Sequence, residues 1–299
     1  MNRIAEVVQD AGLGAEIAAA ALASWILPER TWWPLTRAIG WAEVRLRLGR
    51  TGASPYPFDR ALAVSVGRSP RSIAAERLAS AHGARLWGLR EYCRARRTHP
   101  VVVGGTVHLD HALAHGHGAI LWVGRFAWAT IITKVGLRQA GCPVTHLSRS
   151  EHGFGTSAFA IRRLNPIWTR IEERFLQDRL VMAPGSEMAA LRALRRCLGA
   201  NGLVSITVGD QGARSVMVPF LNGKLRLATG PLTLAAACGS PILPVFTVRE
   251  NEGTFLVQVE APIEAALNQD RKWREARMAE AYARRLEFWV RNYPGQWLG

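Results

Sequence analysis

Short apolar runs alternate with amphipathic segments from residue 101 to the end of the chain. The runs are rich in β-branched residues, and the segments between them repeat apolar residues at helical spacing. Strands that alternate with helices of about ten residues predict an α/β domain with a central, mostly parallel sheet flanked by helices. The expected strands are 101–103, 119–123, 143–147, 180–183, 203–208, 241–249 and 255–259.

The segments between these strands have the apolar spacing of helices. Ser186 is expected to cap one of them, because a serine hydroxyl accepts from free N–H groups at a helix start. Pro166 is expected to separate two others, because proline interrupts the helical hydrogen-bond ladder. The last helix is expected to bury Trp273, Tyr282, Leu286 and Trp289. The expected helices are 130–139, 157–164, 167–176, 186–198, 230–238 and 271–292.

The N-terminal part has helical periodicity without strand signals. We therefore predict a helical region over 1–97 and the α/β domain over 98–299. The longest apolar run, 17–27, is about half of the ~20 residues that span a bilayer, and acidic residues precede it where a secretory signal is basic. The chain is thus expected to be cytoplasmic, soluble or peripheral on the inner membrane face. Trp and Arg mingle over 28–50, which fits a membrane interface and equally a helix packed through its aromatic face.

Basic residues dominate the charge of the chain. Lys and Arg number 38 against 23 Asp and Glu, a formal net charge of +15. An anionic membrane surface or an acidic carrier protein would complement this charge, and an arginine-rich composition bias would also produce it. No nucleic-acid-binding motif is visible, so nucleic acid is not an expected partner. The four cysteines are widely spaced and predict neither disulfides nor a zinc site.

The stretch 101–130 reads VVVGGTVHLDHALAHGHGAILWVGRFAWAT, with an expected strand at 119–123 that ends in Gly124-Arg125-Phe126. It resembles the active-site entry of the lipid A late acyltransferases, within the lysophospholipid acyltransferase superfamily. The family segment is similar to Gly-His-Phe-Gly-Asn-Trp-Glu, a His-x4-acid motif. In this chain Arg125 stands at the histidine position and Thr130 at the acid position.

Further segments of the chain resemble the same family, in the same order. The resemblance covers roughly 100–297. These segments are Asp210-Gln211 after a strand, Val218-Pro219-Phe220 before Gly223, Thr229-Gly230 opening a helix, Pro241 to Pro244, and Tyr293-Pro294-Gly295-Gln296-Trp297 at the end.

The resemblance implies acyl transfer from an acyl carrier protein or coenzyme A thioester to a hydroxyl or amine, with no cofactor and no metal. In the family, the histidine takes the acceptor's proton and the acid orients the imidazole. Arg125 cannot do this because its guanidinium stays protonated. Thr130 cannot orient a base as a carboxylate would. The chain thus resembles the family in its other segments but not in the catalytic histidine and acid.

A first hypothesis keeps acyl transfer with a different base. His152 is the candidate, in the loop after the strand 143–147, with Glu151 or Asp210 tuning its imidazole and Arg125 stabilising an oxyanion or binding a phosphate. The alternatives are a solvated loop histidine and, for Asp210, a structural turn. The expected substrate-binding residues are Arg149, Gln211, Phe126, Trp128 and Thr130.

Two other hypotheses stay open. In one, the pocket catalyses cyclisation, hydrolysis or condensation of a carrier-bound intermediate, with Arg125 binding a carboxylate or enolate. In the other, the protein binds acyl chains or a carrier protein without catalysis. Separately, His108, His111 and His115 fall on one helical face, where they would ligate zinc, although an ordinary polar helix is the expected reading.

Overall fold

A seven-stranded sheet forms the centre of the computed structural model, which describes residues 3–51, 59–93, 101–209, 212, 214–250, 253–263 and 270–299. Five strands run parallel, and the edge pair β9 and β1 runs the opposite way, since β9 is antiparallel to β8 and β1 is parallel to β9. The predicted α/β fold with a mostly parallel sheet is confirmed. The strand order is β1 (Val101–Gly104), β9 (Phe255–Val259), β8 (Ile242–Arg249), β2 (Ala119–Val123), β5 (Leu203–Thr207), β3 (Thr145–Arg149) and β4 (Asp178–Met182).

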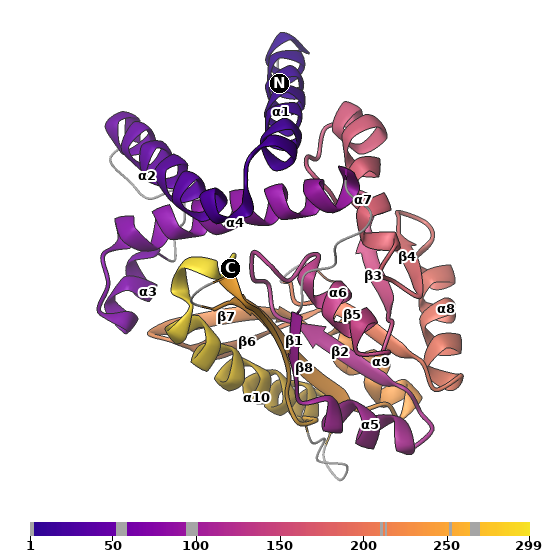
Figure 1. The fold of residues 1–299 in the computed structure, drawn as a ribbon. Helices are drawn as coiled ribbons and strands as arrows, with labels where there is room; N and C mark the ends of the chain where they lie inside the picture. The colour runs from indigo at the N-terminus through magenta and orange to yellow at the C-terminus, as the bar shows by residue number, and fades with distance from the viewer. Residues whose placement is uncertain are drawn as a thin grey trace.

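Helices cover the sheet, and Figure 1 shows α10 along one face. Every residue of β2 is buried, because helices pack on both sides of this central strand. Trp122 of β2 packs on Tyr282 of α10, with ring centroids 4.1 Å apart. The helices after β1 are α5 (Thr106–Ala114), α6 (Ile132–Gln139), α7 (Asn165–Glu173), α8 (Glu187–Gly199), α9 (Gly230–Cys238) and α10 (Arg271–Asn292).

Three helix details differ from the sequence prediction. Pro166 does not separate two helices, because a π-helical turn at Ala160–Leu164 runs directly into α7, where the proline occupies the first turn. The Ser186 hydroxyl precedes α8 as expected, but it bonds to the backbone of Ala183 and not to the helix. Trp273 is 40% exposed, unlike the other expected buried residues of the last helix.

A hairpin that the sequence analysis did not predict joins β5 to α9. Its strands are β6 (Ser215–Phe220) and β7 (Gly223–Ala228), antiparallel and paired at Phe220 and Gly223. The two-residue turn places Leu221 at a φ of 49°. Hairpin turns of this length normally use Gly, Asn or Asp at such a position, so a leucine gives no turn signal.

The N-terminal part is helical as predicted, with a break at Pro28 before a short 3-10 turn. Its helices are α1 (Arg3–Ile26), α2 (Trp32–Thr51), α3 (Asp59–Val66) and α4 (Pro70–Cys93). Figure 1 shows α4 lying across the sheet, with α1 and α2 on its far side. Among the described residues, no helix combines the length and apolar character that a membrane crossing requires. The division of the chain at residue 97 stays a prediction.

A buried ion pair fixes α4 to the end of the chain. Arg77 contacts Asp59 at 2.5 Å, and both side chains are fully buried. The Arg77 Nε also donates to the Trp297 carbonyl at 2.6 Å. Residues 94–100, which follow α4, lie outside the described residues. Through Arg77, α4 is held against the terminal segment 293–297. That segment borders residues 124–130, here named the motif loop.

Candidate active site

Three loops follow neighbouring parallel strands, at the carboxyl ends of these strands. β2, β5 and β3 are adjacent and parallel, so the segments after Val123, Thr207 and Arg149 begin side by side. Ligands of open α/β sheets bind at the carboxyl ends of the strands. The terminal segment borders the first loop, because the Ala127 N–H donates to Gln296 and the Leu298 N–H donates to the Arg125 carbonyl, both at 2.8 Å.

The first loop carries Arg125 and Thr130, the two positions that the sequence analysis aligned with the family's histidine and acid. Arg125 is exposed, and its guanidinium forms no hydrogen bond or ion pair with another residue that the structure describes. Phe126 is buried and pairs with Trp297 in an isolated bridge. Trp128 is also buried, with its ring centroid 4.9 Å from that of Phe255. The loop therefore exposes the Arg125 guanidinium beside the buried rings of Phe126 and Trp128.

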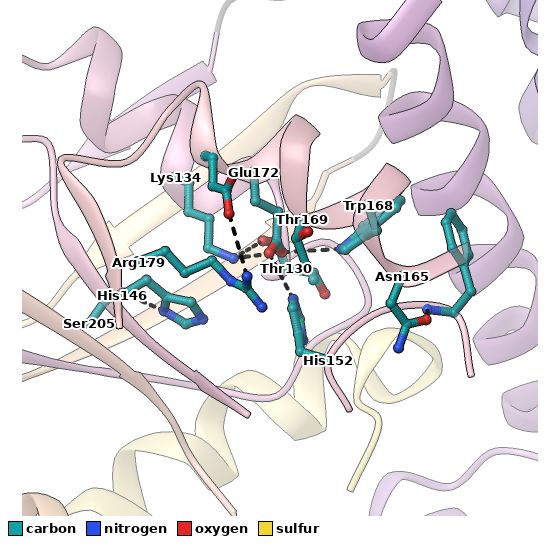
Figure 2. A network of polar contacts seen from close by, with 12 residues as sticks. Thr130, Lys134, His146, His152, Asn165, Trp168, Thr169, Glu172, Arg179 and Ser205 are labelled. Carbon is teal, nitrogen blue, oxygen red and sulfur yellow. Dashed lines mark hydrogen bonds and ion pairs between the residues drawn. The ribbon is translucent and has the colours of Figure 1, made fainter. Parts of the chain in front are cut away.

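A buried polar network begins at the last position of that loop. The Thr130 carbonyl accepts from Lys134 Nζ at 2.7 Å, and Lys134 Nζ contacts Glu172 Oε1 at 2.6 Å (Figure 2). The other carboxylate oxygen, Oε2, lies 2.8 Å from His152 Nε2. Trp168 Nε1 donates to Glu172 Oε1 at 3.1 Å. The structure thus places a histidine–carboxylate pair beside the motif loop, built from different residues.

Helix spacing aims the members of this network at one point. Lys134 lies in the first turn of α6, four residues after Thr130, and Glu172 lies one turn after Trp168 in α7, so Trp168 and Glu172 share a helix face. Glu172 is fully buried, and Lys134 is 4% exposed. The His152 side chain is 25% exposed. The carboxylate is therefore buried, and the imidazole is partly exposed to solvent.

Asn165, at the start of α7, holds the loop that carries His152. Its side-chain oxygen accepts from the N–H groups of Phe154 and Gly155, at 2.8 and 3.1 Å. Its amide donates to the Glu151 and Gly155 carbonyls. Gly153 has a φ of 146°, and a Cβ there would lie 2.5 Å from Asn165, so only glycine fits. The imidazole is therefore preorganised by a helix start.

The electrostatics fix which nitrogen of His152 carries a proton. Burial alone would raise the pKa of the Glu172 carboxyl, but the Lys134 ammonium and the His152 hydrogen bond outweigh burial and hold that pKa at about 2. An ionised carboxylate only accepts hydrogen bonds, so Nε2 of His152 must donate. Nδ1 then keeps its lone pair in the neutral ring. This arrangement is that of a general base with an orienting acid.

A second histidine, His146 of β3, lies behind the first. Its Nδ1 is 2.8 Å from the Ser205 hydroxyl, and its ring centroid is 6.3 Å from that of His152. Burial, and secondarily the nearby Lys134 ammonium, holds the pKa of His146 well below its ordinary value of 6.5. His146 is therefore neutral in the folded protein.

This buried neutral ring predicts acid sensitivity. As the pH falls below 6.5, the unfolded chain takes up a proton that buried His146 does not, so the free energy of unfolding should fall. The slope is at most about 1.4 kcal/mol per pH unit for one proton. Urea unfolding over about pH 5 to 7 measures it. His146→Gln should flatten the slope, whereas the exposed His117→Gln should not. An equal slope in His146→Gln would assign the effect to other groups.

The expected site residues do not all meet. Arg149 ends β3 as an exposed cation, and Glu151 is exposed, with its carbonyl and not its carboxylate turned to Asn165. Asp210 and Gln211 lie outside the described residues. On α5 the His111 and His115 rings touch, with centroids 5.0 Å apart. Across the described ranges, no three His, Cys, Asp or Glu side chains are placed to hold a metal ion.

Glu172 and Lys134 were missed by the sequence analysis, although a signal existed. Trp168, Ile171, Glu172 and Phe175 follow the i, i+3, i+4, i+7 spacing of a buried helix face, so a carboxylate occupies a core position. Charged residues are almost never fully buried without a partner. That misplaced charge indicated a paired, buried acid next to the His152 loop.

Comparison with known proteins agrees with this architecture. The model of the bacterial lipid A biosynthesis acyltransferase family matches residues 79–298, which include the second part of α4, the motif loop, the buried network and the terminal segment. No curated protein matches the chain. The match indicates an acyltransferase-like enzyme with an acyl donor and a lipid-like acceptor. From residue 79 to residue 298, the chain belongs to the bacterial lipid A biosynthesis acyltransferase family.

Proposed function

We propose that this protein transfers an acyl group from a thioester to a hydroxyl or amine, with His152 as the general base and Glu172 as its orienting acid. The observation that supports this is the 2.8 Å contact between His152 Nε2 and the fully buried Glu172 carboxylate, which is linked through Lys134 to the Thr130 carbonyl of the motif loop. The pair takes over the roles of the family's histidine and acid at Arg125 and Thr130.

Nδ1 of His152 takes the proton of the acceptor's O–H or N–H as that atom attacks the thioester carbonyl. The new C–O or C–N bond forms, and the carbonyl electron pair moves to oxygen. The pair returns as the C–S bond breaks, and the imidazolium gives its proton to the leaving thiolate. Glu172 stays ionised and stabilises the imidazolium. Arg125, exposed at the end of β2, stabilises the oxyanion.

The donor is an acyl carrier protein or coenzyme A. Both are anionic, and the chain carries a net charge of +15. Arg125 and Arg149 are exposed at the ends of neighbouring loops, where they would meet a phosphate of the donor. Asp210 and Gln211 remain candidates for tuning the base and binding substrate, as expected from the sequence.

The N-terminal helices support a peripheral position on the inner face of the cell membrane. Leu22, Trp25 and Ile26 near the end of α1 are 55–62% exposed, and Trp41 and Leu46 of α2 are 40% and 72% exposed. Large apolar side chains beside arginines are typical of segments that lie at the headgroup level.

The test incubates the full chain with a panel of acyl carrier protein and coenzyme A thioesters, and follows the intact mass of the carrier. We expect loss of the acyl mass, slowed by at least about 10²-fold in His152→Gln, whose amide keeps a donor to Glu172 but is not a base. His117→Gln, at an exposed position, is the matched control and should keep the wild-type rate.

Each other outcome contradicts a part of the proposal. An unchanged rate in His152→Gln would remove His152 as the base. Release of free acid or a cyclised product in place of an acylated acceptor would favour a repurposed enzyme acting on a carrier-bound intermediate. A complex with an unchanged carrier mass would favour a binding protein, for which the free Arg125 guanidinium is an anion contact.

A further inference from the structure

A cavity of about 290 Å³ lies between the N-terminal helices and the sheet, apart from the His152 pair. Edge-on and tilted ring contacts shape its floor, since Phe255 contacts both Trp87, at 5.9 Å, and Trp128, at 4.9 Å between centroids. Trp128 belongs to the motif loop, so the cavity ends at that loop. The residues that line it are Glu29, Arg30, Trp32, Trp33, Thr36, Gly83, Trp87, Trp128, Arg249, Gly253 and Phe255.

The cavity contains a cation, Arg249, that has no counter-charge among the described residues. Arg249, at the end of β8, is half-buried and stacks on Trp33, with its guanidinium carbon 4.6 Å from the ring centroid. No carboxylate of the described residues forms an ion pair with it. Among the described lining residues, the acid is Glu29, and it contacts Arg90 at 3.2 Å. Burial lowers the pKa of Arg249, so an anion would relieve a real electrostatic cost.

We propose that this cavity binds a planar organic monoanion of the aromatic carboxylate or sulfonate class. The anionic group accepts from the Arg249 guanidinium, which offers planar, paired donors. The ring system lies among Trp33, Trp87 and Phe255, where flat faces and edges pack at ordinary aromatic distances. The volume is near the lower limit of small-molecule sites, so the occupant is small. The proposal does not depend on the proposed acyl transfer.

Fluorescence titration of the full chain with 8-anilino-1-naphthalenesulfonate tests this, with N-phenyl-1-naphthylamine as its neutral analogue. Arg249→Gln should weaken binding of the sulfonate by at least about tenfold and leave the neutral analogue unchanged, because only the charge-assisted contact is lost. Arg138→Gln removes the same charge from an exposed site on α6 and should change neither. Circular dichroism and thermal melting confirm that each variant is folded.

Competition then tests the shape of the occupant. 2-Naphthoate should displace the bound sulfonate at concentrations at least about tenfold lower than decanoate, which carries the same charge on a flexible chain. Equal sulfonate affinity in folded Arg249→Gln would overturn the site, because the dye would then bind elsewhere. Stronger displacement by decanoate would overturn the planar class and favour an acyl chain. Neither result depends on catalytic turnover, so the proposed function stands or falls separately.

Discussion

Glu172→Gln is expected to lower acyl-transfer turnover by about 10²- to 10⁴-fold, the range for losing an oriented general base. Glu172 accepts from Lys134 and Trp168 through one oxygen and from His152 through the other. A glutamine must keep its oxygen toward Lys134 and Trp168, since both can only donate. Its NH₂ group then faces His152.

That reversed hydrogen bond changes the tautomer of the base. His152 Nε2 would have to accept, so the ring proton would move to Nδ1, the nitrogen that takes the acceptor's proton in the wild type. The imidazole would stay in place and lose its function. Loss of the carboxylate also removes the group that stabilises the imidazolium.

Single-turnover kinetics with a thioester measure the loss of rate, and the ¹⁵N NMR shifts of the His152 ring nitrogens report the change of tautomer. Glu173→Gln is the matched control, because the side chain of this neighbour is 47% exposed and its carboxylate contacts Arg179, at 3.4 Å. Glu172→Asp should recover part of the rate by restoring an acceptor. A folded Glu172→Gln with the wild-type rate would make the buried carboxylate a purely structural group and would remove the proposed dyad.

The sheet was predictable because local sequence determines it. Strands such as β2 and β8 are continuous apolar runs, and their lengths follow from where Gly, Pro or charged residues begin. The β6–β7 hairpin was not predictable in the same way. Leu221 occupies a left-handed conformation that leucine disfavours, and packing of β6 and Phe220 against the terminal Trp297 and α10 imposes it.

The site was predictable only in part, for a different reason. His152 could be found because a loop after a strand of a parallel sheet is a known place for chemistry. Its partner could not be found from spacing, since Glu172 comes from a helix 20 residues later and its charge depends on Lys134, 38 residues away. The sequence contained the anomaly, an acid on an apolar helix face. The tertiary structure determines which histidine and which lysine contact this acid.

Lys134→Met is expected to destabilise the fold by about 3–5 kcal/mol, because it leaves the Glu172 carboxylate buried without its cation. Methionine has a similar length and cannot donate to the Thr130 carbonyl or to Glu172. The pKa of Glu172 should rise above its value of about 2, since burial is then less opposed. Chemical denaturation at neutral pH measures the loss of stability.

The double variant Lys134→Met/Glu172→Gln separates the charge from the packing. With both ionised groups neutral, most of the lost stability should return, because an uncompensated buried charge costs more than a missing ion pair.

The dependence of stability on acidic pH gives an independent test. In the wild type, the depressed pKa makes Glu172 lose its stabilising effect as the pH falls from 4.5 to about 2. In Lys134→Met that loss of stability should shrink as the pKa of Glu172 rises.

If the double variant were no more stable than Lys134→Met, packing of the lysine stem and not pairing with Glu172 would explain the burial of Lys134. The dyad would then lack the ammonium that keeps its acid ionised.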